Sequence, residues 1–220
     1  MKRRIDSYTN GETSFLLLIL ELIGTVAFAF SGATVGTQKK MDIFGVAILA
    51  MTTAVGGGII RDIILNITPP AAFREPVFAV LAIVVGIIVF FYRKYHFKVH
   101  KQSVYEMMLR TMDSIGLGLF TVIGVETAYA NVPETNLFLA VFVGVITGVG
   151  GGVLRDVMAG NMPYIFTKHF YACASLIGAL VCSLCWSFPG PVFSMLSGAM
   201  TIIVLRNMAA HYRWSLPKIE

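Results

Sequence analysis

A pattern of three glycines followed by an arginine and an aspartate occurs twice in this chain. Residues 54–62 read AVGGGIIRD and residues 148–156 read GVGGGVLRD, and six of the nine positions are identical. Both copies lie in apolar segments, where a central arginine or aspartate costs roughly 2.5–3.5 kcal/mol on insertion scales. Residues that are so costly in lipid mark ion or substrate pathways, so the two copies are our first candidates for a functional site.

The glycines of each copy have two interpretations. Small residues let helix backbones approach closely in membranes, which would make the glycines packing residues. Alternatively, three glycines, each costing roughly 1 kcal/mol relative to alanine, kink or unwind the helix so that its freed backbone groups face a polar cavity. Packing motifs commonly space small residues four apart, so we favour the kinked, cavity-lining interpretation. The residues concerned are Gly56, Gly57, Gly58, Gly150, Gly151 and Gly152.

The charged residues of each copy must pair with one another or face water. Arg61 and Asp62 follow the first glycine run, and Arg155 and Asp156 follow the second. Adjacent helical residues point about 100° apart, which disfavours pairing within a copy. We therefore expect Arg61 to pair with Asp156 and Arg155 with Asp62. Such pairs act either as a structural lock between the halves or as a gate or ion-contacting site, and both interpretations stay open.

Other polar residues also recur in the two halves. Thr53 and Thr147 precede the glycine runs by one turn, and their hydroxyl groups either coordinate a cation or bond to carbonyl groups of their own helix. Glu21 and Asp113 occupy equivalent positions at the start of each half. They are either interfacial charges or line a vestibule.

The similarity extends beyond the nine-residue copies. The segment 21–24 matches 113–116, and further matches follow on both sides of the glycines: Phe28 with Phe120, Gly32 with Gly124, and Pro69 with Pro163. The chain is therefore an internal duplication.

Composition identifies an integral membrane protein. Of the 220 residues, 56% are hydrophobic and only 13% are charged, whereas a soluble domain carries about 25% charged residues. The mean hydropathy is +0.77. Cys173, Cys182 and Cys185 share one apolar stretch and lack the further ligands of a metal site, so we interpret them as packing residues.

Seven segments are apolar enough to cross a membrane, which takes roughly 20 residues. They are residues 14–34, 44–67, 77–92, 109–125, 137–160, 170–186 and 192–206. The first is retained rather than cleaved as a signal peptide, because it has a counterpart in the second half. Each half contains three segments, and an odd number requires the halves to be inverted relative to each other.

We therefore predict an all-α membrane protein with a single transmembrane domain over residues 1–220. Its seven helices form two inverted three-helix repeats, at about 14–92 and 105–186, plus an extra C-terminal helix at about 192–206. We expect the small-residue faces of the first and fourth helices to form the contacts between subunits. Those faces contain Gly24, Gly32, Gly116, Gly118 and Gly124.

Basic residues set the predicted orientation, because lysine and arginine favour the cytoplasmic side. One side receives Lys39, Lys40, Arg93, Lys94, Lys98, Lys101, Lys168, Arg206, Arg213 and Lys218. The other side receives Lys2, Arg3, Arg4, Arg74, Glu126 and Glu134. The larger basic set places the C-terminus in the cytoplasm and the N-terminus outside.

The glycine–arginine–aspartate pattern in the second and fifth helices resembles that of the trimeric intracellular cation channel family, in its prokaryotic branch. A family once described as glycine transporters has the same pattern. The resemblance covers nearly the whole chain, including the two repeats and the final extra helix. It implies a homotrimer in the prokaryotic inner membrane, with a pore in each subunit for monovalent cations, potassium or sodium, chiefly potassium.

Residue by residue, the resemblance implies that the six glycines are the kinks of two pore-lining helices. Arg61, Asp62, Arg155 and Asp156 would lie along or beside that pore. From their positions before the glycine runs, Thr53 and Thr147 are our further candidates for polar or gating residues. Membrane lipids are expected partners. We expect no cofactor, no nucleic-acid partner and no enzymatic activity.

A second function class stays open, a secondary transporter for glycine or another small zwitterion. A fixed arginine repels cations unless it is neutralised, whereas an arginine is a natural clamp for a carboxylate. Apart from the two aspartates, however, the sequence offers no evident site for a coupling ion. A purely structural role is a third reading, and the polar residues at membrane depth argue against it.

Overall fold

The structure is a computed structural model that describes residues 11–95, 102–167, 170–212 and 214, and the regular structure in these residues is entirely helical. The helices are α2 (Gly11–Gln38), α3 (Ile43–Ile64), α4 (Ala71–Arg74), α5 (Val77–Tyr95), α6 (Gln102–Asn131), α7 (Leu137–Met158), α8 (Tyr164–Thr167), α9 (Tyr171–Leu184) and α10 (Pro191–His211). The prediction of an all-α membrane protein is confirmed.

Six helices in the described part of the chain are long and apolar enough to cross a membrane: α2, α3, α5, α6, α7 and α10. The remaining apolar helix, α9, has 14 residues and a length of roughly 21 Å, shorter than a hydrocarbon core of about 30 Å. A seventh crossing at this position stays a prediction.

The long helices α2 and α6 lie side by side and run antiparallel. A Cβ atom at Gly24 would lie 3.1 Å from the ring of Phe120, and Gly116 faces the ring of Phe28. The two rings pack with centroids 5.3 Å apart. Large side chains of each helix thus fill the space that glycines of the other leave open.

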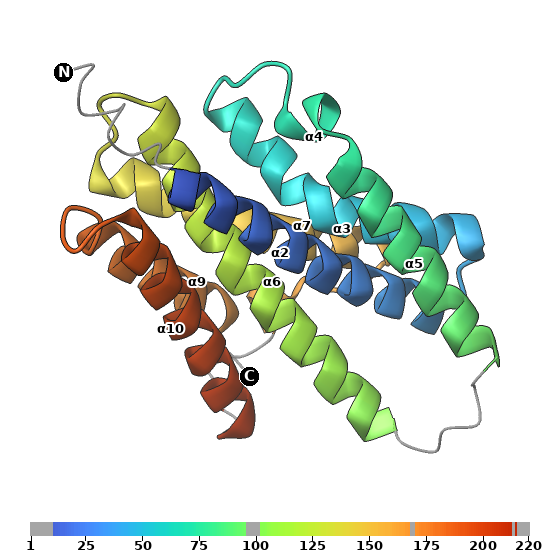
Figure 1. Cartoon of the computed structure of the whole chain (residues 1–220). Helices are drawn as coiled ribbons and strands as arrows, with labels where there is room; N and C mark the ends of the chain where they lie inside the picture. The colour runs from blue at the N-terminus through green and yellow to red at the C-terminus, as the bar shows by residue number, and fades with distance from the viewer. Residues whose placement is uncertain (1–10, 96–101, 168–169, 213, 215–220) are drawn as a thin grey trace.

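The other helices pack around this pair, as Figure 1 shows. Helix α5 covers α2 and α3, and α9 covers α6 and α7. Helix α10 packs against α6 and α9, on the side of the molecule away from α5. Helices α3 and α7, which carry the glycine runs, pack against each other.

Both glycine-bearing helices begin and end in the same way. Asp42 and Asn136 cap their N-termini by accepting hydrogen bonds from the amides of Gly45 and Leu139. Just past their C-termini, Asn66 and Gly160 have φ values of 56° and 65°. These are left-handed conformations that end a helix and that glycine and asparagine tolerate. The two copies of the sequence thus specify the same local structure.

The glycines expected in subunit contacts are used inside the subunit instead. Gly32 packs against Thr53 of α3, Gly124 against Thr147 of α7, and Gly118 against the carbonyl oxygen of Ala199 in α10. With Gly24 and Gly116 facing phenylalanine rings, all five glycines serve packing within one chain. The prediction was wrong because a sequence does not tell which neighbouring helix a small-residue face meets.

One of the basic residues counted at the cytoplasmic side lies within a helix instead. Arg206 lies inside α10 and is buried. Of the remaining charges used for orientation, Lys2, Arg3, Arg4, Lys98, Lys101, Lys168, Arg213 and Lys218 lie outside the described residues.

Candidate functional site

The glycine runs of α3 and α7 form the crossing point of these two helices. A Cβ atom at Gly57 would overlap the carbonyl oxygen of Thr147, and one at Gly151 would overlap that of Thr53. Both helices continue through their glycines without interruption. The structure therefore has the close packing that we disfavoured from sequence, and neither run contains an unwound turn.

Gly56 and Gly152 face neighbouring side chains, whereas Gly150 faces backbone. A Cβ atom at Gly56 would lie 2.5 Å from Leu154 Cδ1, and one at Gly152 would lie 2.8 Å from the hydroxyl oxygen of Tyr171. At Gly150 it would meet the Cα atom of Gly57 at 3.2 Å. Gly58 is different, because its nearest neighbour would be Arg61 Nη2 at 3.8 Å.

The two threonines bond to their own helices. Thr53 Oγ1 donates to the carbonyl oxygen of Leu49 at 2.6 Å, and Thr147 Oγ1 donates to that of Val143 at 2.7 Å. Both side chains are buried. Of the two interpretations left open from sequence, the structure has the bond to the helix carbonyl.

Each arginine pairs with the aspartate that follows it, and the pairing expected across the repeats does not occur. Arg61 Nε lies 2.8 Å from Asp62 Oδ1, and Arg155 Nε lies 2.8 Å from Asp156 Oδ1. The expectation failed because the crossing is antiparallel, so Arg61 and Arg155 lie beyond it in opposite directions. At a rise of 1.5 Å per residue they are about 18 Å apart along the helices. An arginine side chain is long enough to fold back onto its neighbour.

The second oxygen of each aspartate holds the segment that follows. Asp62 Oδ2 accepts a hydrogen bond from the amide of Ala71 at 2.7 Å, at the start of α4. Asp156 Oδ2 accepts one from the amide of Tyr164 at 2.9 Å, at the start of α8. Each aspartate thereby neutralises an arginine and caps a short helix.

Arg155 has additional partners and is fully buried. Its Nη1 donates to Ser31 Oγ of α2 and to Asp113 Oδ1 of α6, both at 2.5 Å. Its guanidinium group lies 4.9 Å from the centroid of the Tyr164 ring, a cation–π contact. Burial raises the pKa of Tyr164, so the phenol stays neutral beside the arginine.

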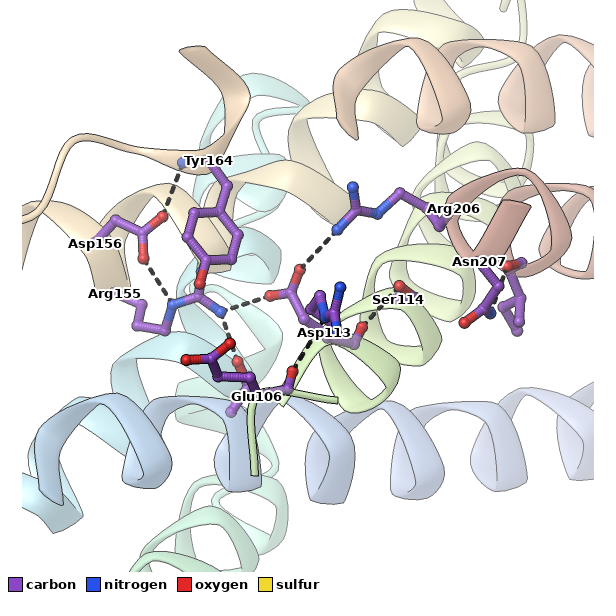
Figure 2. A network of polar contacts seen from close by, with 11 residues as sticks. Glu106, Asp113, Ser114, Arg155, Asp156, Tyr164, Arg206 and Asn207 are labelled. Carbon is purple, nitrogen blue, oxygen red and sulfur yellow. Dashed lines mark hydrogen bonds and ion pairs between the residues drawn. The ribbon is translucent and has the colours of Figure 1, made fainter. Parts of the chain in front are cut away.

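Figure 2 shows Asp113 between Arg155 and Arg206. Arg206 Nη2 lies 3.8 Å from Asp113 Oδ2, and its guanidinium group lies 4.6 Å from the centroid of the Tyr171 ring. Sequence reasoning missed Arg206 as a site residue. The available signal was its apolar surroundings in the last helix, because an arginine there needs a buried counter-charge such as Asp113.

The site in the first half is built differently. Arg61 is 7% exposed, and within the described residues its recorded ion pair is the one with Asp62. Glu21, the counterpart of Asp113, is only partly buried. Glu21 and Glu126 both lie near enough to Arg61 to interact with its charge. This end therefore carries more acidic than basic side chains, whereas the Arg155 end carries two of each.

The arrangement gathers charged and polar side chains at membrane depth, which suits contact with a charged solute. Buried arginines, aspartates and hydroxyl groups lie on both sides of a helix crossing, in segments that lipid would otherwise surround. Among the described residues there is no group of histidine, cysteine, aspartate and glutamate side chains arranged to hold a metal ion.

Comparison with known sequences gives related bacterial membrane proteins. The family model described as "Glycine transporter" matches this chain twice, at residues 18–94 and 110–187. The inner membrane protein YadS of Escherichia coli (strain K12) is 36% identical over 202 residues, which cover 91% of this chain and 94% of YadS. A membrane protein of Vibrio cholerae is 35% identical over 98% of this chain and 87% of its own length.

Comparison with solved structures gives cation channels. A prokaryotic TRIC channel in 0.5 M KCl has a TM-score of 0.84 and 32% identity, covering 92% of this chain and 100% of that chain. The TRIC trimeric intracellular cation channel orthologue from Rhodobacter sphaeroides has a TM-score of 0.82 and 31% identity, covering 90% and 98%.

Proposed function

Because this chain belongs to the trimeric intracellular cation (TRIC) channel family, in its prokaryotic branch, we propose that it is a channel for monovalent cations, chiefly potassium. The observation that carries the proposal is the likeness to solved cation channels, with TM-scores of 0.82 and 0.84 at 31% and 32% identity over nearly the whole chain. No enzymatic function is indicated, since these neighbours are ion channels.

In the proposed channel, the cation path runs between α3 and α7 within each subunit. Its constriction is the helix crossing at Gly57 and Gly151, where the backbones are in contact and the path is closed. A bend at the glycine runs, Gly56 to Gly58 and Gly150 to Gly152, would separate the helices. Support comes from the buried polar residues that flank the crossing: Thr53, Thr147, Arg61, Asp62, Arg155 and Asp156.

The proposed architecture is a single transmembrane domain with inverted repeats at about 14–92 and 105–186 and an extra helix at about 192–206. It is supported by the antiparallel packing of equivalent helices, α2 with α6 and α3 with α7. Seven crossings would place the N-terminus outside and the C-terminus in the cytoplasm, on the side with more basic residues.

The proposed assembly is a homotrimer embedded in lipid. The neighbour from Rhodobacter sphaeroides is described as trimeric. The glycines of α2 and α6 are occupied within the subunit, so other faces must meet the neighbouring subunits or lipid. The exposed apolar row of Val80, Val84 and Ile88 on α5 belongs to such a face.

A second candidate, a transporter of glycine, is favoured by the description of the matching family model. The geometry at the arginines argues against it. Arg61 and Arg155 are already paired with aspartate side chains, so their positive charges are neutralised and attract a substrate carboxylate less strongly.

One experiment separates the two candidates. Purified protein is reconstituted into lipid vesicles, and potassium flux and uptake of labelled glycine are measured on the same preparation. A channel gives potassium flux with glycine uptake no greater than in protein-free vesicles. Glycine uptake without potassium flux would refute the channel.

A further inference from the structure

Asp113 of α6 lies between two arginines that come from different helices. Arg155 of α7 approaches one carboxylate oxygen at 2.5 Å, and Arg206 of α10 approaches the other at 3.8 Å. Asp113 and Arg155 are 0% exposed, and Arg206 is 6% exposed. Together with Asp156, which pairs with Arg155, they form a buried group of two positive and two negative charges.

Within residues 11–95, the first half of the chain has no equivalent of this group. Glu21 replaces Asp113 and is partly buried, and none of the helices described there corresponds to α10, which supplies Arg206. Helix α10 packs instead against α6 and α9 of the second half. The fourth charge of the group therefore comes from α10, a long helix outside the duplicated segments.

We infer that Arg206 is a positioning residue that sets the charge balance at the Arg155 end of the cation path. It acts through Asp113, whose carboxylate it shares with Arg155, so that the four side chains carry no net charge. The inference rests on the proposed channel function and goes beyond it, because it assigns control of one end of the path to α10.

The geometry indicates which property of Arg206 matters. Its contact with Asp113 is longer than a hydrogen bond, so charge rather than hydrogen-bond geometry links the two side chains. The guanidinium group lies over the face of the Tyr171 ring, which is itself buried. In a buried site a single uncompensated charge acts strongly on a nearby ion, because screening by water is weak.

Three variants test the charge balance. Asp113→Asn leaves one excess positive charge, Arg206→Met leaves one excess negative charge, and the double variant restores neutrality. Single-channel potassium conductance is measured in planar bilayers at about 0.01 M and about 1 M KCl, where the screening length falls from about 30 Å to about 3 Å.

At low salt we expect Asp113→Asn to lower the conductance by about tenfold, because fields focused in a cleft change local ion concentration by 10-fold or more. Arg206→Met raises the conductance above that of the wild type, because its excess negative charge attracts cations, and the double variant returns to within about twofold of the wild type. At high salt the differences shrink. Equal conductance of Asp113→Asn and the double variant would overturn the inference.

Matched controls separate charge from packing. Arg206→Lys keeps the charge and should behave as the wild type, and so should Asn207→Ala, since Asn207 is exposed on the same helix.

If Asp113→Asn does not fold, recovery of a folded protein by the double variant, measured by thermal melting, is the expected result. If neither Asp113→Asn nor the double variant folds, the test compares the low-salt conductance of Arg206→Met with that of Arg206→Lys. Equal conductance of these two variants would overturn the inference. A wild-type protein without cation current would refute the proposed function, and the melting comparison would still test the charge balance.

Discussion

At the scale of single residues, the aspartates Asp62 and Asp156 are the permissive partners of the arginines. Each neutralises its preceding arginine through one oxygen and caps a short helix through the other. An uncompensated arginine beside a cation path would repel potassium. At 4 Å and an effective dielectric constant near 20, two unit charges interact by about 4 kcal/mol, which is enough to close a path.

We therefore expect Asp62→Asn and Asp156→Asn to lower potassium flux, because each exposes a positive charge. Arg61→Ala and Arg155→Ala should keep or raise the flux where the protein still folds. Flux into vesicles at equal protein content measures this. Loss of flux in both arginine variants, with the fold intact, contradicts the neutralisation model.

The two arginines should differ in their effect on stability. Arg155 contacts Ser31, Asp113 and Asp156 and is fully buried, so its removal leaves buried carboxylates with fewer partners. Breaking a buried pair costs about 3–5 kcal/mol. Arg61→Ala should cost less, because it removes the arginine from one buried carboxylate, that of Asp62, rather than from two. Thermal melting in detergent compares the stability of the two variants. A larger loss of stability in Arg61→Ala than in Arg155→Ala would contradict this prediction.

At the scale of helices, the glycine runs let α3 and α7 touch. Any side chain at Gly57 or Gly151 would meet a backbone carbonyl oxygen, which cannot move aside as a flexible side chain can. Gly58, in the same run, faces only the end of the Arg61 side chain. The middle glycine of each run therefore sets the distance between the helices.

Alanine substitutions test this difference. Gly57→Ala and Gly151→Ala should destabilise the protein by about 1–3 kcal/mol through overpacking. Gly58→Ala is the matched control and should be neutral or stabilising by up to about 1 kcal/mol, because alanine favours the helix. Melting temperatures of the three variants provide the measurement. Equal stability of Gly57→Ala and Gly58→Ala would show that the crossing does not depend on Gly57.

The sequence alone predicts the helical spans, the duplication and the positions of the glycines, arginines and aspartates, because hydropathy and internal similarity are local patterns. It does not predict the partners. Pairing of Arg61 with Asp62 depends on where the antiparallel helices cross, and Gly32 packs on Thr53 rather than on another subunit. Arg206 was missed because its partner Asp113 is 93 residues away in the sequence.

At the scale of the whole molecule, we expect a homotrimer with its C-termini in the cytoplasm. The exposed apolar faces of helices such as α5 must be covered by lipid or by neighbouring subunits. A C-terminal reporter that is active only outside the cytoplasm should stay silent, and a reporter active only inside should give signal.

Native mass spectrometry in mild detergent should give trimers, and only monomers or dimers would count against the assembly.

The reversal potential of the purified protein in a planar bilayer shows directly whether the protein conducts cations. With a tenfold gradient of KCl across the bilayer, a path selective for potassium over chloride gives a reversal potential approaching about 59 mV, with the sign of a cation current. A reversal potential near zero or of the opposite sign, or no current from well-folded protein, would contradict the assignment of this chain as a cation channel.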